Sequence, residues 1–221
     1  MALTNFPPLY PILDAAFLPP DLALRSETLA RLVASLAEAG VEILQYRNKQ
    51  GDEAEILRDA ELIRSFAPSR LFLILNDYPD LVTEAGFHGV HLGQTDLPAR
   101  QARERLGPDI LIGLSTHNEV QLRVAALEPV DYIAIGPVFA TTSKANPDPV
   151  IGLDGIRAAR RLTTIPVVAI GGITVDNALE VWGAGADSIA LISAIFASPI
   201  DPAKSAAAFL RAFRELPMSL H

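Results

Sequence analysis

Short runs of apolar residues recur along the chain and alternate with segments that have the hydrophobic spacing of helices. The expected strands are residues 9–13, 41–44, 71–75, 89–93, 110–114, 132–135, 166–170 and 188–192. Most of these runs are apolar throughout and do not alternate with polar residues. Continuous apolar runs are typical of parallel strands that are covered on both faces. The pattern therefore predicts an α/β protein with a parallel sheet.

A helix is expected in nearly every interval between these strands. Ser26 is a candidate N-cap for the first helix, because Leu29, Leu32, Val33 and Leu36 follow it at helical spacing. Further helices are expected after Gly51–Asp52, near 79–85, after Pro98, after Asn118, at 153–162, from Thr174 to about Gly183, and at 201–215. The predicted order is thus strand and helix in regular alternation.

Eight such units in 221 residues favour a single (β/α)8 TIM barrel, with residues 1–221 forming one domain. In such barrels the active site lies at the carboxyl ends of the strands. The alternative is an open, doubly wound sheet. No Gly-x-Gly-x-x-Gly follows the first expected strand, which argues against the dinucleotide-binding form of that fold.

Composition narrows the function classes. The formal net charge of −8 argues against nucleic acid as a partner. The absence of cysteine excludes disulfides, thiolate catalysis and thiolate metal sites. We expect no signal peptide and no membrane span, since no apolar run reaches about 18 residues. A cytoplasmic protein fits these features, and barrels of this kind often pair through their outer helices, so a homo-oligomer is possible.

The polar residues that follow the second apolar run form the first candidate site. Gln45, Arg47 and Lys49 are spaced two apart, so in an extended strand their side chains project to the same side. Three hydrogen-bond donors together, two of them permanent cations, suit a polyanion such as a diphosphate. The alternative is a solvated strand end with ordinary surface charges.

Polar residues also follow the other expected strands. Asn76 and Asp77 follow the third strand, and Asp96 follows the fourth. In a barrel, Asp77 and Asp96 would come from adjacent strands and face the same anion. Paired carboxylates beside a diphosphate would repel it, so we expect a Mg²⁺ ion between them. The alternative is a salt-bridge network of these aspartates with lysine and arginine.

A second anion site is expected at the last two strands. Gly171 and Gly172 follow the seventh strand, and Ile192 and Ser193 belong to the end of the eighth. Loops at these positions bind phosphate through backbone N–H groups in many barrels, and glycine permits close approach. Two anion sites in one pocket suggest a transferase that joins two phosphorylated small molecules and releases pyrophosphate.

Several blocks of sequence resemble the thiamine phosphate synthase family across nearly the whole chain. The matching blocks are residues 45–49, 76–80, 89–96, 113–117, 131–139 and 170–173. The resemblance implies a barrel enzyme that joins hydroxymethylpyrimidine diphosphate to thiazole phosphate or its carboxylate. One local departure is Ser143, where the family commonly has threonine.

The resemblance also implies residue roles. The residues implied to bind the pyrimidine diphosphate are Gln45, Tyr46, Arg47, Asn48, Lys49, Asn76, Ser115 and Lys144. Among these, Arg47, Lys49, Ser115 and Lys144 are implied to be catalytic. The residues implied to bind the thiazole phosphate are Thr141, Thr142, Ser143, Gly172, Ile192 and Ser193. Asp77 and Asp96 are the implied Mg²⁺ ligands.

Two alternative functions remain at this point. A thiazole tautomerase shares the barrel and a Ser-x-His segment like residues 115–117, with His117 as the proton carrier. Such relatives generally lack the charged set that is present here. A non-catalytic sensor of thiamine phosphate is the other alternative. His117 is otherwise expected to be hydrogen-bonded to the backbone at a helix start, and His91 to be a core histidine.

Overall fold

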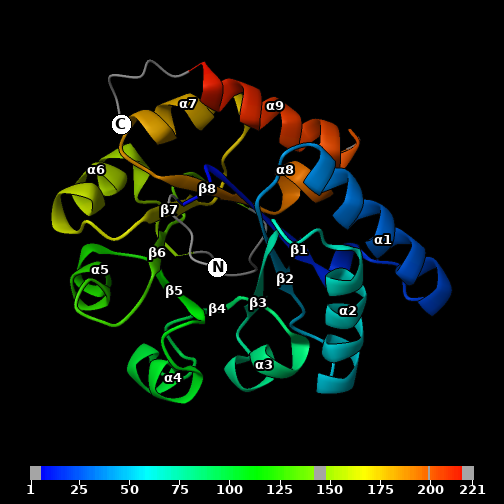
Figure 1. Cartoon of the computed structure of the whole chain (residues 1–221). Coiled ribbons are helices and arrows are strands. Elements are labelled where there is room, and N and C mark those ends of the chain that lie inside the picture. The colour runs from blue at the N-terminus through cyan, green and yellow to red at the C-terminus, as the bar shows by residue number, and fades with distance from the viewer. Residues whose placement is uncertain (1–5, 142–147, 199, 216–221) are drawn as a thin grey trace.

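Eight parallel strands pair in sequence order and close into a barrel, because β8 returns to pair with β1. The computed structural model describes residues 6–141, 148–198 and 200–215. Figure 1 shows the strands in the centre with the helices around them. The predicted (β/α)8 barrel is therefore confirmed.

The strands have these bounds: β1 Leu9–Asp14, β2 Ile43–Arg47, β3 Phe72–Asn76, β4 Gly89–Leu92, β5 Leu111–Thr116, β6 Tyr132–Ile135, β7 Val167–Ile170 and β8 Ser188–Leu191. The α-helices are α1 Leu22–Glu38, α2 Glu53–Phe66, α3 Val82–Ala85, α4 Ala99–Leu106, α5 Glu119–Ala125, α6 Gly152–Leu162, α7 Val175–Gly183, α8 Ser193–Phe196 and α9 Pro202–Arg214. Two 3-10 turns, η1 Ala15–Phe17 and η2 Pro79–Leu81, follow β1 and β3.

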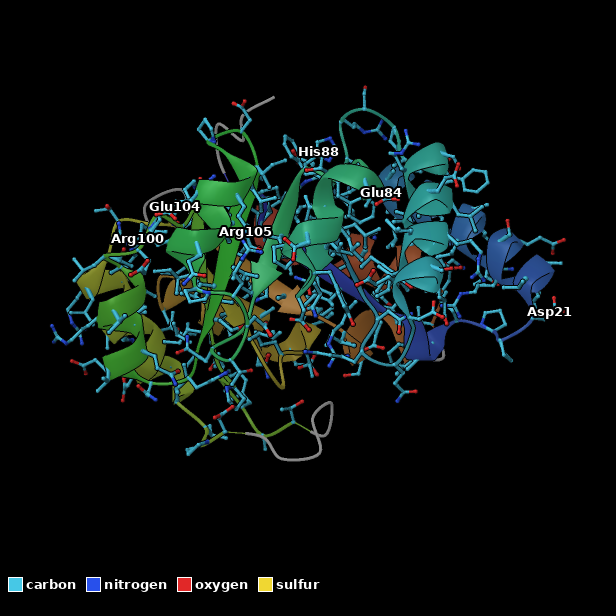
Figure 2. All side chains as sticks on the ribbon, turned by 90° about the horizontal axis from the view of Figure 1, so that it is seen from below. Asp21, Glu84, His88, Arg100, Glu104 and Arg105 are labelled. Atoms are coloured by element: carbon cyan, nitrogen blue, oxygen red, sulfur yellow. The ribbon has the colours of Figure 1, made fainter. Side chains whose placement is uncertain are left out.

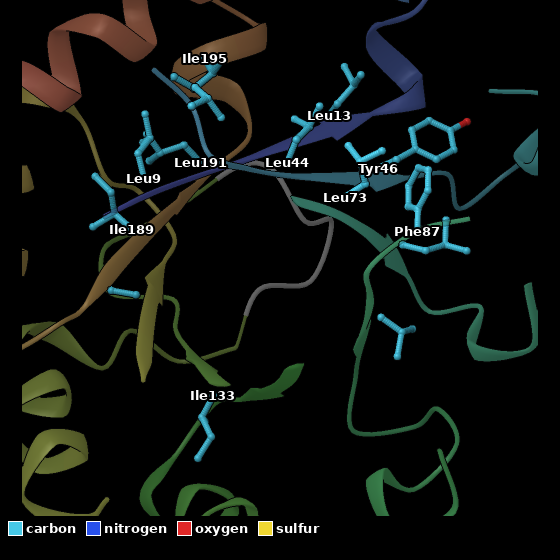
Figure 3. Packing of buried hydrophobic residues seen from close by; sticks show 14 of the residues in the cluster. Leu9, Leu13, Leu44, Tyr46, Leu73, Phe87, Ile133, Ile189, Leu191 and Ile195 are labelled. Atoms are coloured by element: carbon cyan, nitrogen blue, oxygen red, sulfur yellow. The ribbon is translucent and has the colours of Figure 1, made fainter. Parts of the chain in front are cut away.

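The alternation of side chains along each strand divides the buried residues into two layers. Tyr10, Ile43, Ile74 and Tyr132 belong to a cluster inside the barrel. The residues between them in sequence pack outward against the helices, as Figure 3 shows for Leu9, Leu44, Leu73 and Ile189. Every second residue of a strand therefore faces the barrel interior, and near the carboxyl end it faces the site.

The first helix begins earlier than predicted. Asp21 is its N-cap and accepts a hydrogen bond from the Leu24 N–H at 2.9 Å, so Ser26 lies within the helix. Leu22 and Leu24 are more than half exposed, at 57% and 52%. The buried apolar residues of α1 therefore start only at Leu29, and the hydrophobic spacing could not indicate the first turn.

Two strands continue further into the polar sequence than their apolar runs indicated. β2 ends at Arg47, and β5 ends at Thr116. The extended backbone therefore fixes the directions of Gln45, Arg47 and Ser115. The short helix α8, which starts at Ser193 directly after β8, was not predicted.

The outer helices carry exposed charged side chains. Figure 2 shows Arg100, Glu104 and Arg105 on α4, at the periphery of the barrel. Arg105 forms an ion pair with Asp80 at 3.1 Å. Among the residues that the structure describes, no helix combines the length and apolar character needed to cross a bilayer.

Candidate active site

A cavity of about 1060 Å³ lies at the carboxyl ends of the strands. Eleven of the predicted site residues line it: Gln45, Arg47, Lys49, Asn76, Asp77, Asp96, Ser115, Thr141, Gly172, Ile192 and Ser193. These residues come from several strands and the loops that follow them. The barrel thus brings together segments that are widely separated in sequence.

The charged residues gather at the ends of β2, β3 and β4. We call Arg47, Lys49, Asp77 and Asp96 the charged side of the mouth. Both cations are already paired: Arg47 with Asp14 at the end of β1, and Lys49 with Asp77. Asp14 pairs with Arg47 in the strand register, which explains the first contact. Two cations, Arg47 and Lys49, therefore lie beside three carboxylates, those of Asp14, Asp77 and Asp96.

The two aspartates of the charged side lie close enough to affect each other. Burial raises the pKa of Asp96, and the nearby negative charge of Asp77 raises it further. The Gly93 N–H donates to Asp96 at 2.6 Å and partly opposes this shift. Asp77 has a φ of +70°, a left-handed conformation that aspartate tolerates better than most residues.

This carboxylate pair fits a Mg²⁺ ion. Mg²⁺ is typically held by one or two carboxylates together with substrate phosphate oxygens and water. Burial and the Asp77 charge outweigh the opposing charge of Lys49 and keep the pKa of Asp96 raised, so a further cation would stabilise its ionised form. Within the described ranges no group of three or more histidine, aspartate or glutamate side chains is placed to hold a metal. Phosphate oxygens of the substrate and water would supply the remaining ligands of a Mg²⁺ ion held by these two aspartates.

Asn76 offers a hydrogen-bond donor to the cavity. It is the last residue of β3 and its side chain is buried. Its Nδ2 atom has no hydrogen-bond partner within the described part of the chain. A buried amide donor without a partner costs free energy, so a ligand oxygen at this position would be stabilising.

The structure does not bring Tyr46 and Asn48 to the cavity. Tyr46 faces outward among Leu44, Leu73 and Phe87, as Figure 3 shows. The Asn48 amide donates to Tyr46 Oη at 3.3 Å and accepts from the Gly51 N–H at 2.8 Å. Tyr46 points away from the cavity because strand residues alternate in direction, and the Asn48 side chain is held in the turn that follows β2. The prediction that these side chains contact the substrate is therefore not supported by their placement.

Tyr46 instead joins a buried network behind β2. Its hydroxyl donates to Asp59 of α2, and the Arg25 Nε of α1 donates to both Asp59 carboxylate oxygens at 2.9 Å. Asp59 is fully buried and Arg25 is 7% exposed. Burial and the adjacent Asp59 charge raise the pKa of Tyr46. The network ties the strand that carries Gln45 and Arg47 to two helices.

The opposite side of the mouth is built from glycine and small residues. We call Gly171, Gly172, Ile192 and Ser193 the glycine side. Gly171 and Gly172 have φ values of +101° and +66°. A Cβ on Gly172 would lie 2.5 Å from the Ala140 carbonyl oxygen, so only glycine fits the approach of the two loops.

Three predicted residues, Thr142, Ser143 and Lys144, lie outside the described residues. Thr141 precedes them and lines the cavity. The Phe139 N–H donates to the Gly171 carbonyl at 3.0 Å. The segment that leads to these residues is therefore held against the glycine side.

Other lining residues were not predicted as site residues. His91 is buried and hydrogen-bonded through both ring nitrogens, as expected of a core histidine, and it also lines the cavity, with Nε2 2.8 Å from Ser115 Oγ. His117 matches its simpler interpretation, because its Nδ1 donates to the Gly136 carbonyl at 2.8 Å. Lys204 reaches the cavity from α9, where no strand-end rule would indicate it.

Comparison with known proteins identifies the family to which the chain is similar. A model of the family described as thiamine monophosphate synthase matches residues 9–195. A thiamine-phosphate synthase of Koribacter versatilis is 50% identical over 94% of this chain and 96% of its own length. One of Albidiferax ferrireducens is 43% identical, over 81% of this chain and 82% of its length.

A solved structure agrees with these relatives. The thiamine phosphate pyrophosphorylase from Pyrococcus furiosus superposes with a TM-score of 0.80 at 31% identity. The superposition covers 94% of this chain and 96% of that one. Family model, sequence relatives and fold thus agree over nearly the whole barrel, and the chain belongs to the thiamine-phosphate synthase family.

Proposed function

We propose that the protein joins hydroxymethylpyrimidine diphosphate to thiazole phosphate, or to its carboxylate, and releases pyrophosphate. Family membership makes it a transferase of thiamine biosynthesis. The observation that carries the proposal is the single cavity lined by both the charged side and the glycine side. A reaction between two phosphorylated molecules needs two anion sites that open onto one space.

The charged side would bind the diphosphate. Arg47 and Lys49 would exchange their present carboxylate partners for phosphate oxygens, and the unpartnered Asn76 amide would donate a further hydrogen bond. Asp77 and Asp96 would hold Mg²⁺, which neutralises charge on the departing pyrophosphate. Lys144 would add a third cation.

The reaction would proceed by breaking the bond between the pyrimidine methylene and the diphosphate oxygen. The bonding electrons leave with pyrophosphate, and the ring system delocalises the positive charge on the methylene. The thiazole nitrogen then donates its electron pair to this carbon. Arg47 and Lys49 would stabilise the negative charge that grows on the leaving oxygen, a kind of interaction often worth about 10²–10³-fold in rate.

The glycine side would hold the second substrate. Gly172 and Ser193 would bind the thiazole phosphate, together with Thr141, Thr142 and Ser143. Holding the thiazole ring beside the methylene would supply rate through orientation alone. No protein nucleophile is required, so the absence of cysteine is compatible with this chemistry.

A product assay separates this function from the two alternatives. The purified protein is mixed with both substrates and Mg²⁺, and pyrophosphate and thiamine phosphate are measured together. We expect equal amounts of the two products and no release from either substrate alone. Isomerised thiazole without pyrophosphate would indicate a tautomerase, and binding without turnover would indicate a sensor.

The biological setting follows from the same proposal. We propose that residues 1–221 act as one barrel domain on small phosphorylated substrates. A cytoplasmic location, the lack of a nucleic-acid partner and assembly into a homo-oligomer stay predictions.

A further inference from the structure

A continuous chain of polar side chains crosses the floor of the barrel. The Gln45 Nε2 donates to Tyr10 Oη at 2.9 Å, and the hydroxyl oxygens of Tyr10 and Tyr132 lie 2.8 Å apart. Tyr132 Oη lies 3.0 Å from His91 Nδ1, and His91 Nε2 lies 2.8 Å from Ser115 Oγ. Gln45 and Ser115, at its two ends, both line the cavity.

The middle of this chain of hydrogen bonds is buried and tightly packed. Tyr10 and Tyr132 are 1% and 0% exposed, and neither lines the cavity. The ring of Tyr132 occupies the space beside Gly113, where any Cβ would overlap it. Burial raises the pKa of both tyrosines, so both hydroxyls keep their protons at neutral pH.

The orientation of the Gln45 amide sets the direction of these hydrogen bonds, and the number of protons carries it from one residue to the next. Each tyrosine hydroxyl has one proton to donate, and a neutral imidazole has one N–H and one acceptor nitrogen. When Gln45 donates to Tyr10, Tyr10 donates to Tyr132, and Tyr132 donates to His91 Nδ1. His91 must then carry its proton on Nε2 and donate it to Ser115 Oγ. The Ser115 hydroxyl then accepts from His91, and its own proton can be donated to another acceptor.

The opposite direction has a different consequence for the substrate. If the Gln45 amide were turned over, Tyr10 would donate to its oxygen, and every hydrogen bond in the chain would reverse. Ser115 would then donate to His91 and offer only lone pairs to the cavity. A diphosphate also offers mainly acceptor oxygens, so this arrangement would be repulsive.

We propose that Gln45, Tyr10 and Tyr132 fix His91 as its Nε2–H tautomer, so that Ser115 donates its hydroxyl proton to the bound diphosphate. Tyr10 and Tyr132 are then positioning residues, since they act on the substrate only through His91 and Ser115. The tautomer rests on the orientation of the Gln45 amide in the ligand-free structure, in which Nε2 faces Tyr10. The role of Ser115 rests on the proposed function.

Nitrogen NMR of the ligand-free protein tests the direction. With histidine labelled by ¹⁵N, long-range proton–nitrogen spectra distinguish a protonated ring nitrogen from an acceptor nitrogen. The protein has four histidines, and the signals that disappear in His91→Gln are those of His91. We expect the Nε2–H tautomer for His91. A wild-type His91 protonated on Nδ1 would overturn the proposal.

A single substitution should reverse the direction of these hydrogen bonds. In Gln45→Glu the ionised carboxylate can only accept, so Tyr10 must donate to it, and His91 should switch to the Nδ1–H tautomer. Because burial raises the pKa of a carboxyl at position 45, spectra are recorded over a pH series, and the tautomer is taken where the carbon shift of the glutamate shows the ionised form. Adding Tyr10→Phe should restore Nε2–H, because Tyr132 can then donate only to His91. An unchanged His91 tautomer in folded Gln45→Glu would contradict the proposal.

Gln94→Glu is the matched control, because Gln94 lines the same cavity but donates to the Ser115 carbonyl oxygen. It adds the same charge outside the chain of hydrogen bonds and should leave the His91 tautomer unchanged. A change of the His91 tautomer in this variant would show that added charge alone causes the effect, and it would overturn the proposal.

Kinetics test the role of Ser115 separately. In Tyr132→Phe we expect kcat to fall about tenfold, with a smaller change in the KM of the thiazole substrate. Unchanged kcat would remove the positioning role. If the protein released no pyrophosphate at all, the proposed function would fail while the NMR result still decided the tautomer.

Discussion

The charged side and the glycine side of the mouth, the two anion sites of the proposed function, differ in how they are built. The charged side uses long side chains that are paired with carboxylates in the absence of substrate. The glycine side depends on a backbone whose course requires positive φ values and close loop contacts. The charged side should therefore be sensitive to lost side chains, and the glycine side to added ones.

Removing a cation from the charged side should have the largest effect. We expect Arg47→Gln to lower kcat by about 10²–10³-fold, because the leaving oxygen loses a charged donor in the transition state. Steady-state kinetics with both substrates measure the change. Arg105→Gln removes an equally charged but exposed side chain from α4 and should leave kcat unchanged. A small effect at Arg47 would shift the catalytic role to Lys49 and Lys144.

Removing a carboxylate should change the magnesium requirement. We expect Asp77→Asn to raise the Mg²⁺ concentration for half-maximal activity by about tenfold or more, a loss of about 1.4 kcal/mol per tenfold. Asparagine tolerates the left-handed backbone at this position, which separates charge from strain. Asp80→Asn, on the outer turn η2, is the control. Wild-type Mg²⁺ dependence in Asp77→Asn would contradict the metal assignment.

Adding one methyl group should disturb the glycine side selectively. We expect Gly172→Ala to raise the KM of the thiazole substrate about tenfold, since the new Cβ would meet Phe139 and Ala140. The KM of the pyrimidine substrate should change much less. Gly183→Ala is the control, because a Cβ there meets nothing within 4 Å. Equal effects on both substrates would mean that the two sides are not independent.

The smallest expected effect is the pH dependence of stability due to Asp96. Its raised pKa means that the folded protein binds this proton more tightly than the unfolded chain does. Its stabilising contribution is therefore present at low pH and lost as pH rises through the raised pKa. Urea unfolding of wild type and Asp96→Asn should show wild type losing stability relative to the variant over this range. Solvent screening keeps the change small, and Mg²⁺ should reduce it.

The sequence indicated the strands and most of the cavity for a clear physical reason. Buried parallel strands need continuous apolar runs, and a closed barrel gathers the residues after each strand at one end. Asp77, Asp96 and Gly172 could be placed by this rule alone. The start of α1 could not, because its first turn is exposed.

Other features depend on contacts between elements. The pairing of Arg47 with Asp14 depends on the register between β1 and β2, and Lys204 approaches from the last helix. Tyr46 and Asn48 belong to a sequence block that resembles the family. A match over a contiguous block does not show which of its side chains face the cavity. The alternation along β2, applied to every residue, would have directed both outward.

The network behind β2 has a consequence for the motion of the mouth. Tyr46 donates to Asp59, which also accepts from Arg25, and Asn48 accepts from the Gly51 N–H in the turn after β2. Releasing this strand end would take the Tyr46 hydroxyl away from the fully buried Asp59 carboxylate, which would lose one of its hydrogen-bond donors at a cost in free energy. Amide protons at the end of β2 should therefore exchange with deuterium only when the barrel opens. If the charged side binds the diphosphate as proposed, the end of β2 offers that ligand a surface held in place by two helices.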